Sequence, residues 1–129
     1  MKPPIERIKV SIRGREILIK IKRNTGLEHW NEICRIALCL SLATSKAPQI
    51  ADKMVDSSIE MDWKTFAGEY QQELAALTLF KAHKDGIDVT KKEALSDYFK
   101  AHVERGIAGL QNIKDLKTIY TYTMSRYKD

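Results

Sequence analysis

The sequence predicts a mainly α-helical protein that begins with a short basic strand and folds as a single domain, residues 1–129. Apolar and charged residues alternate over residues 5–13, which is the period of a strand. From residue 27 onward apolar residues recur every three or four positions, which is the period of a helix. A hydrophobic content of 43% with 30% charged residues is typical of a globular protein, neither disordered nor membrane-embedded. We expect a cytoplasmic location, because the N-terminus lacks the apolar stretch of a secretory signal.

Positive charge is concentrated at the N-terminal end. Residues 1–25 hold eight Lys and Arg side chains and two Glu, a net charge of +6, while the whole chain carries +5. Such a segment is suited to neutralising the phosphates of a nucleic acid, although it could also be a solvated face that aids solubility. The candidate DNA-binding residues are Lys9, Arg13, Arg15, Lys20, Lys22 and Arg23.

The region after the first strand has two interpretations. Ile17, Ile19 and Ile21 continue the alternation, so residues 13–16 could form a turn between two strands, and β-branched residues favour this hairpin. Alternatively, Ser11 could cap a helix over residues 12–24 that ends at Gly26. That helix would bury Gly14, Ile17, Leu18 and Ile21.

Residues 27–42 predict a second helix, with a wide apolar surface. Trp30, Ile33, Ala37 and Leu40 lie on one stripe, and Cys34, Ile36, Leu38 and Leu42 widen it. A helix that is apolar nearly all round must be covered on several sides, and in a chain this small we expect a second subunit to cover part of it. The predicted subunit interface is Trp30, Ile33, Ile36, Ala37 and Leu40.

The remainder predicts a connector over residues 43–62 and up to three further helices, four to five in total. The third helix covers residues 63–84, with an apolar stripe of Trp63, Phe66, Tyr70, Leu74, Leu77 and Phe80. The fourth runs from a capping box at Thr90 and Glu93 to about Asn112. Its stripe is Leu95, Phe99, His102, Val103, Ile107 and Leu110. Helix-like spacing of Leu116, Ile119, Tyr120 and Tyr127 predicts a shorter helix in the tail.

We predict no catalytic residue, metal site or cofactor. The three histidines lie on different segments, and the sequence has no glycine-rich phosphate loop. Cys34 and Cys39 would lie roughly 140° apart on one helix, so they cannot form a disulfide with each other or share a metal ion. We interpret His102 and Arg105 as a packed or hydrogen-bonded pair.

Several motifs resemble one known family. The order of a basic strand, a helix, Asn24-Thr25-Gly26-Leu27 and the run WNEICRIALCLSL resembles the E proteins of the bacterial DNA phosphorothioation (Dnd) system, the DndE family. Gly68-Glu69-Tyr70, His83-Lys84-Asp85-Gly86 and the segment from Ala101 to Gly106 agree with it. The resemblance extends from about residue 5 to 110 and leaves the tail uncovered.

The resemblance implies a non-enzymatic DNA-binding protein that prefers nicked duplex and assembles as a homotetramer. Its partners would be double-stranded DNA and the other proteins that replace a non-bridging phosphate oxygen by sulfur. It implies a ribbon-helix-helix-like N-terminal half and therefore favours the helix over the hairpin for residues 12–24. Gly14 departs from a good helix former. The alternatives are a ribbon-helix-helix transcriptional repressor, or an assembly scaffold of the modification complex without DNA contact.

Overall fold

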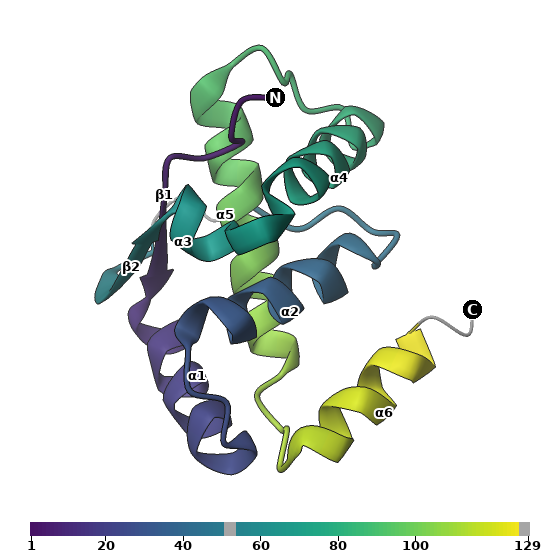
Figure 1. Ribbon diagram of the computed structural model, residues 1–129. Helices are drawn as coiled ribbons and strands as arrows, with labels where there is room; N and C mark the ends of the chain where they lie inside the picture. The colour runs from purple at the N-terminus through teal and green to yellow at the C-terminus, as the bar shows by residue number, and fades with distance from the viewer. Residues whose placement is uncertain (51–53, 127–129) are drawn as a thin grey trace.

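The computed structural model describes residues 1–50 and 54–126 and is mainly helical, with one two-stranded antiparallel sheet (Figure 1). The elements, in chain order, are β1 (Arg7–Ser11), α1 (Ile12–Thr25), α2 (Trp30–Leu42), β2 (Asp56–Asp62), α3 (Trp63–Ala67), a 3-10 turn η1 (Gly68–Tyr70), α4 (Gln71–Lys84), α5 (Lys92–Gly109) and α6 (Leu116–Arg126). The N-terminal half thus runs strand, helix, helix, as predicted. The expected Tyr127 of the tail helix lies outside the described residues.

The sheet is a ribbon that lies over the core. Ile8 is paired with Met61 and Lys9 with Glu60 across the two antiparallel strands. The apolar side chains of both strands are buried, and their charged neighbours point to solvent. The prediction of a connector over residues 43–62 was therefore wrong for β2. Only two apolar residues of β2, Ile59 and Met61, face the core, too few for a clear alternating signal.

The centre of the molecule is the crossing of α2 and α5 (Figure 1). Gly106 of α5 lies against the backbone of Ala37 in α2, and a Cβ on Gly106 would be only 1.9 Å from the Ala37 carbonyl oxygen. The apolar residues of both helices pack around this point, among them Ile33, Leu38 and Ile107. The close approach lets the two helices share one dense core.

Residues 12–24 are helical, so the hairpin interpretation was wrong and the helix is confirmed. The Ser11 Oγ accepts a hydrogen bond from the Gly14 N–H at 3.0 Å, and Gly26 ends the helix with φ 76°. The buried residues are Gly14, Ile17, Leu18 and Ile21, as that interpretation required. The helix prevails over β-propensity because Ile17, Leu18 and Ile21 fall on a single buried face, although Ile12 and Ile19 are exposed.

The single helix predicted over residues 63–84 is interrupted. Gly68, with φ 57°, ends α3, and the 3-10 turn follows before α4 begins. The apolar stripe is divided as well: Trp63, Phe66 and Leu74 are buried, whereas Leu77 and Phe80 are 52% and 65% exposed. The interruption changes the direction of the chain, so residues on either side no longer share one face.

The start of α5 also differs from the prediction. The residue before its first turn is Lys91, which makes no side-chain cap, and the predicted capping box does not form. Instead Thr90 donates from its backbone N–H and its hydroxyl to the Asp88 carboxylate, a local turn that competes with capping. The predicted apolar stripe of this helix is buried in full, including His102.

Candidate nucleic-acid interface

The first turn of α1 is held in place by Glu104 of α5. The Glu104 carboxylate accepts hydrogen bonds from the Ser11 backbone N–H, at 3.0 Å, and from the Ser11 hydroxyl. The same hydroxyl oxygen accepts the Gly14 N–H. A buried negative charge at a helix N-terminus interacts favourably with the helix dipole. The orientation of α1 is therefore fixed to the core of the protein.

Gly14 is needed for this close packing. A Cβ at this position would lie 2.8 Å from Cγ1 of Val10 and 3.2 Å from the Glu104 carboxylate. Both neighbours are buried. Glycine is a poor helix former, but its lack of a side chain lets the start of α1 pack closely against β1 and α5.

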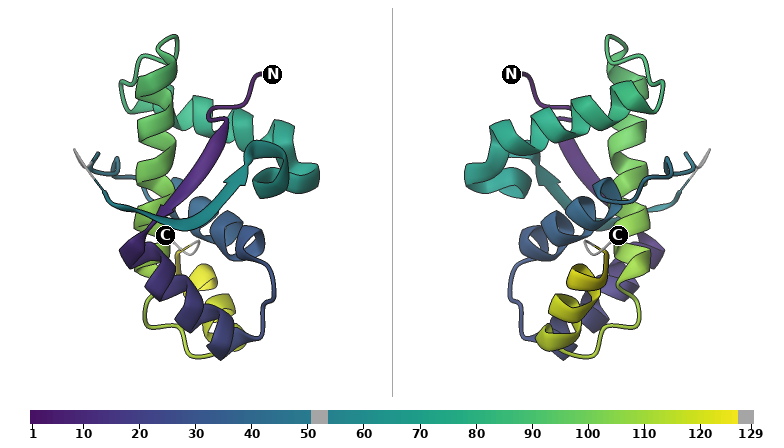
Figure 2. Two further views of the ribbon diagram at one scale, coloured as in Figure 1. Left: turned by 90° about the vertical axis from the view of Figure 1, so that its left-hand side faces the viewer. Right: turned by 90° about the vertical axis from the view of Figure 1, so that its right-hand side faces the viewer.

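The other surface of α1 presents cations to solvent. At about 100° per residue, Arg13 and Lys20 fall on one flank of α1 and Arg15 and Lys22 on the opposite flank, with Arg23 between them on the outward side. We call these five residues the α1 basic face. Figure 2 (left) shows α1 in front, at the surface of the molecule. Lys22 is partly buried and the other four are exposed.

The two flanks of α1 border different elements. The Arg13 guanidinium donates to the Gln111 side chain at 3.4 Å, just beyond the end of α5. The Lys22 ammonium lies 4.4 Å from the centroid of the Trp30 ring at the start of α2. The basic face therefore spans the full width of the helix between its two neighbours.

The cations of α1 outnumber the carboxylates of the helix five to one. Among the described residues, none of the five forms an ion pair, and α1 contains one acidic residue, Glu16. Lys92, by contrast, lies 2.7 Å from Glu6. Cations without a carboxylate partner can neutralise phosphates without first giving up an ion pair.

Lys9, the sixth predicted DNA-binding residue, lies in a different setting. It sits on the outer face of the ribbon, directly across from Glu60. Arg7 on the same face is 3.3 Å from Glu60 and is paired in register with Asp62. The two cations of β1 therefore meet two carboxylates of β2, and the outer face of the ribbon is close to neutral.

Two lysines that sequence reasoning missed lie near the α1 basic face. The Asn24 side chain donates to the Ile113 carbonyl oxygen at 3.2 Å, which places the segment after α5 beside the end of α1. Lys114 and Lys117 follow in this segment and are exposed. Their charge is visible in the sequence, but no local pattern indicates that residues 24 and 113 are neighbours.

The predicted subunit interface on α2 is mostly covered by the chain itself. Ile33 and Ala37 are fully buried and Leu40 is 5% exposed, packed in the main core. Trp30 and Ile36 are half-buried. Packing against α5 and α3 thus accounts for much of the apolar surface of α2, and of the five predicted residues only Trp30 and Ile36 keep partly exposed surface for another subunit.

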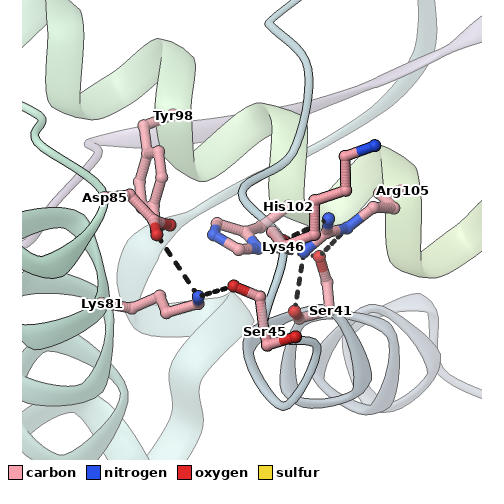
Figure 3. A network of polar contacts seen from close by, with 8 residues as sticks. All are labelled: Ser41, Ser45, Lys46, Lys81, Asp85, Tyr98, His102 and Arg105. Atoms are coloured by element: carbon pink, nitrogen blue, oxygen red, sulfur yellow. Dashed lines mark hydrogen bonds and ion pairs between the residues drawn. The ribbon is translucent and has the colours of Figure 1, made fainter.

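His102 and Arg105 belong to a polar network at the end of α2 (Figure 3). His102 Nδ1 lies 2.7 Å from Ser41 Oγ, and the Arg105 guanidinium donates to both the hydroxyl and the carbonyl oxygen of Ser41. Arg105 also donates to the carbonyl oxygen of Lys46 at 2.7 Å. The pair therefore ties α5 to the end of α2 and to the segment that follows it.

A second part of the network joins α4 to α5. Tyr98 donates to the Asp85 carboxylate at 2.7 Å, and Lys81 lies 3.4 Å from the same carboxylate while donating to the Ser45 carbonyl oxygen (Figure 3). Burial, reinforced by nearby Arg105, lowers the pKa of His102 to about 4. Its Nε2 is buried with no hydrogen-bond partner among the described residues. His102 is therefore neutral near pH 7 and acts as a packing residue.

The two cysteines are free thiols. Burial, with a contribution from the charge of Glu104, raises the pKa of Cys34 to about 12, and burial also raises the pKa of Cys39. Both are therefore protonated near neutral pH and behave as small apolar residues. In residues 1–50 and 54–126, no three His, Cys, Asp or Glu side chains are grouped to hold a metal ion.

A cavity of about 1260 Å³ opens between the first turn of α1, α5 and the segment after α2. Its walls include Ile12, Ile50 and Met54, together with Glu104 and Arg105. The last two are engaged in holding α1 and α2. We assign no ligand to this cavity.

No helix in the described part of the chain is long and apolar enough to cross a bilayer.

The fold and the surface define a small, mainly helical protein that presents a cationic helix to solvent. A model of the family described as DNA sulphur modification protein DndE matches residues 7–118. The chain therefore belongs to the DndE family.

Solved structures agree with this assignment. The chain is similar to DndE from Escherichia coli B7A, involved in DNA phosphorothioation modification, with a TM-score of 0.65 and 27% identity over 85% of this chain and 99% of that one. It is also similar to a DndE mutant involved in DNA phosphorothioation, with a TM-score of 0.63 and 25% identity over 83% of this chain and 97% of that one. No curated protein matches the chain.

Proposed function

We propose that this protein is a non-enzymatic DNA-binding component of the DNA phosphorothioation machinery, and that it binds duplex DNA through the α1 basic face. The observation that carries the proposal is the run of five cations on one helix, none with an ion-pair partner among the described residues. Membership of the DndE family supports the pathway. Its partners would be DNA and the other proteins of the modification system, and it would assemble as a homotetramer.

Contacts of this kind bind the phosphate backbone and do not read bases. Lys and Arg side chains on an exposed helix release counterions from DNA and give an affinity that falls steeply with salt. Because the cations occupy both flanks and the outward side of α1, a duplex that bends toward the helix brings more phosphates within reach. A nick lowers the cost of bending, so we expect nicked duplex to bind more tightly than intact duplex.

The test is a salt series with two double variants. Lys20→Ala with Lys22→Ala removes one cation from each flank of α1. Lys91→Ala with Lys92→Ala removes the same charge at the start of α5, whereas Glu104, which holds α1, lies toward the other end of that helix. Affinity for nicked and intact duplexes of equal length is measured by fluorescence anisotropy from low to moderate salt, and folding is checked by circular dichroism.

For the α1 variant we expect weaker binding to both duplexes and a log–log salt slope reduced by about two, near 0.9 for each lost phosphate contact. The α5 variant should keep the parental slope. Equal slopes for both variants would contradict the proposed surface. No binding of either duplex by the parent protein would favour the scaffold alternative.

A ribbon-helix-helix repressor would read DNA with the ribbon and prefer one operator. On the outer face of this ribbon Glu60 and Asp62 offset Arg7 and Lys9, so the ribbon offers phosphates little net attraction. Equal affinity for unrelated sequences would exclude the repressor.

A further inference from the structure

Helix α4 leaves an apolar ridge uncovered. Leu77 and Phe80 are 52% and 65% exposed, and Glu73 and Lys84 continue the ridge at spacings of four, three and four residues. We call Glu73, Leu77, Phe80 and Lys84 the α4 seam. This spacing is that of the contact seam of a coiled coil. At about 100° per residue, the seam lies ~145° around the helix from the side that packs on the core.

We propose that two copies of this protein associate through the α4 seam, with the two helices antiparallel. The spacing of the seam residues, four, three and four, is symmetrical about a point midway between Leu77 and Phe80. A two-fold axis through that point places Leu77 of one copy against Phe80 of the other, and Glu73 against Lys84 at both ends. Such self-complementarity is the requirement for a two-fold interface.

The charges select both the partner and the direction. Glu73 and Lys84 are eleven residues apart, roughly 16 Å along the helix, so they cannot pair within one chain. Neither forms an ion pair among the described residues. The Lys84 ammonium lies 5.6 Å from the centroid of the Phe80 ring, which keeps its charge at the seam. A parallel pairing would place Glu73 beside Glu73, and so it is disfavoured.

The location of α4 makes this pairing compatible with the rest of the molecule. In Figure 1, α4 lies at the upper right and α1 at the lower left, so a pairing through α4 leaves the α1 basic face open. A tetramer with two-fold symmetries needs more than one kind of interface, and the seam would supply one of them. The inference does not rest on DNA binding.

The test uses charge reversal in the seam. Sedimentation velocity over a wide concentration range is measured for the parent protein and for Glu73→Lys, Lys84→Glu and the double variant. Each single variant places like charges at both ends of the interface and should weaken association at least ~10-fold. The double variant restores opposite charges and should associate like the parent. Gln72→Lys, which adds charge on α4 outside the seam, is the matched control and should also associate like the parent.

Mixing the two single variants gives an independent result. At both ends of a mixed interface, a lysine of the Glu73→Lys copy would face a glutamate of the Lys84→Glu copy. The mixture should therefore form a heterodimer, detected by sedimentation of one fluorescently labelled variant. A parent protein that stays monomeric at all concentrations overturns the proposal. So does association that is unchanged in Glu73→Lys, because the copies would then meet through another surface.

Discussion

Gly106 of α5 and Ala37 of α2 are in backbone contact, and this contact sets the distance between the two central helices. The Cα atom and the carbonyl group of Ala37 occupy the space in which a side chain at position 106 would begin. The polar network around Ser41 lies one turn further along α2, and the Glu104 carboxylate lies just before the glycine on α5. The position of α1 thus depends on this crossing.

Gly106→Ala should destabilise the protein by about 3 kcal/mol or more, because the new methyl group forces α2 and α5 apart. The free energy of unfolding in urea measures this. Gly109→Ala is the control: its Cβ would meet only the Tyr122 hydroxyl, at 3.3 Å, and we expect a change within about 1 kcal/mol. Similar values for both would contradict the packing described.

Gly14→Ala should also lower the free energy of unfolding, by about 1–2 kcal/mol, although alanine is the better helix former. The added methyl group would meet Cγ1 of Val10 and the Glu104 carboxylate. A urea titration measures the change, and a gain in stability would show that helix propensity outweighs the contact.

Stability should fall between about pH 6.5 and 4 because of His102. Its pKa is about 4 in the folded protein and near 6.5 when unfolded, so over this interval the unfolded chain binds a proton that the folded one does not. Above pH 6.5 His102 is neutral in both states and does not lower the free energy of unfolding. As the pH falls from 6.5 to 4, the free energy of unfolding decreases by about 3 kcal/mol in all. Urea unfolding across this interval should show a weaker pH dependence in His102→Gln. The exposed His83→Gln should behave like the parent.

Cys34 should remain unmodified by iodoacetamide at pH 8 in the native protein and react once the protein is unfolded in urea. Its thiol is buried and its pKa is about 12, so little thiolate is present. Peptide mass spectrometry after timed labelling measures this. Rapid native labelling at Cys34 would contradict the burial.

Single substitutions should distinguish DNA binding by α1 from DNA binding by the ribbon. We expect Lys20→Ala and Lys114→Ala each to reduce the salt slope of DNA binding by about one. Lys9→Ala should change it less, because Glu60 lies directly across the ribbon from Lys9. The salt dependence of binding to one duplex measures all three variants, and a larger effect for Lys9 would place DNA on the ribbon.

Local signals in the sequence predicted the apolar stripe of α5 but not its start, and they offered a helix as one of two interpretations for α1. The cap at Ser11, the four buried positions and the stop at Gly26 are all encoded within residues 11–26, and the apolar stripe of α5 is encoded within that helix. Local signals did not decide between a helix and a hairpin for residues 12–24. β-Branched residues favoured strands, and only the packing of Ile17, Leu18 and Ile21 on one face decides it.

Features that depend on distant residues could not be predicted. β2 requires β1 as a partner, and the exposure of Leu77 and Phe80 follows from the change of direction at Gly68. The six predicted cations were chosen by their nearness in sequence. The structure separates Lys9 from the other five because its neighbours across the ribbon are acidic, and it places Lys114 nearby through the Asn24 contact.

The bond between Ser11 and Glu104 has a consequence for the order in which the chain folds. The two residues are 93 positions apart, so during synthesis the whole of α1 leaves the ribosome long before its carboxylate partner is made. Contacts of such long range form late. A nascent chain that ends before residue 104 would carry all six cations and still lack a fixed cationic surface. The orientation of α1 is therefore set only after most of α5 has been synthesised.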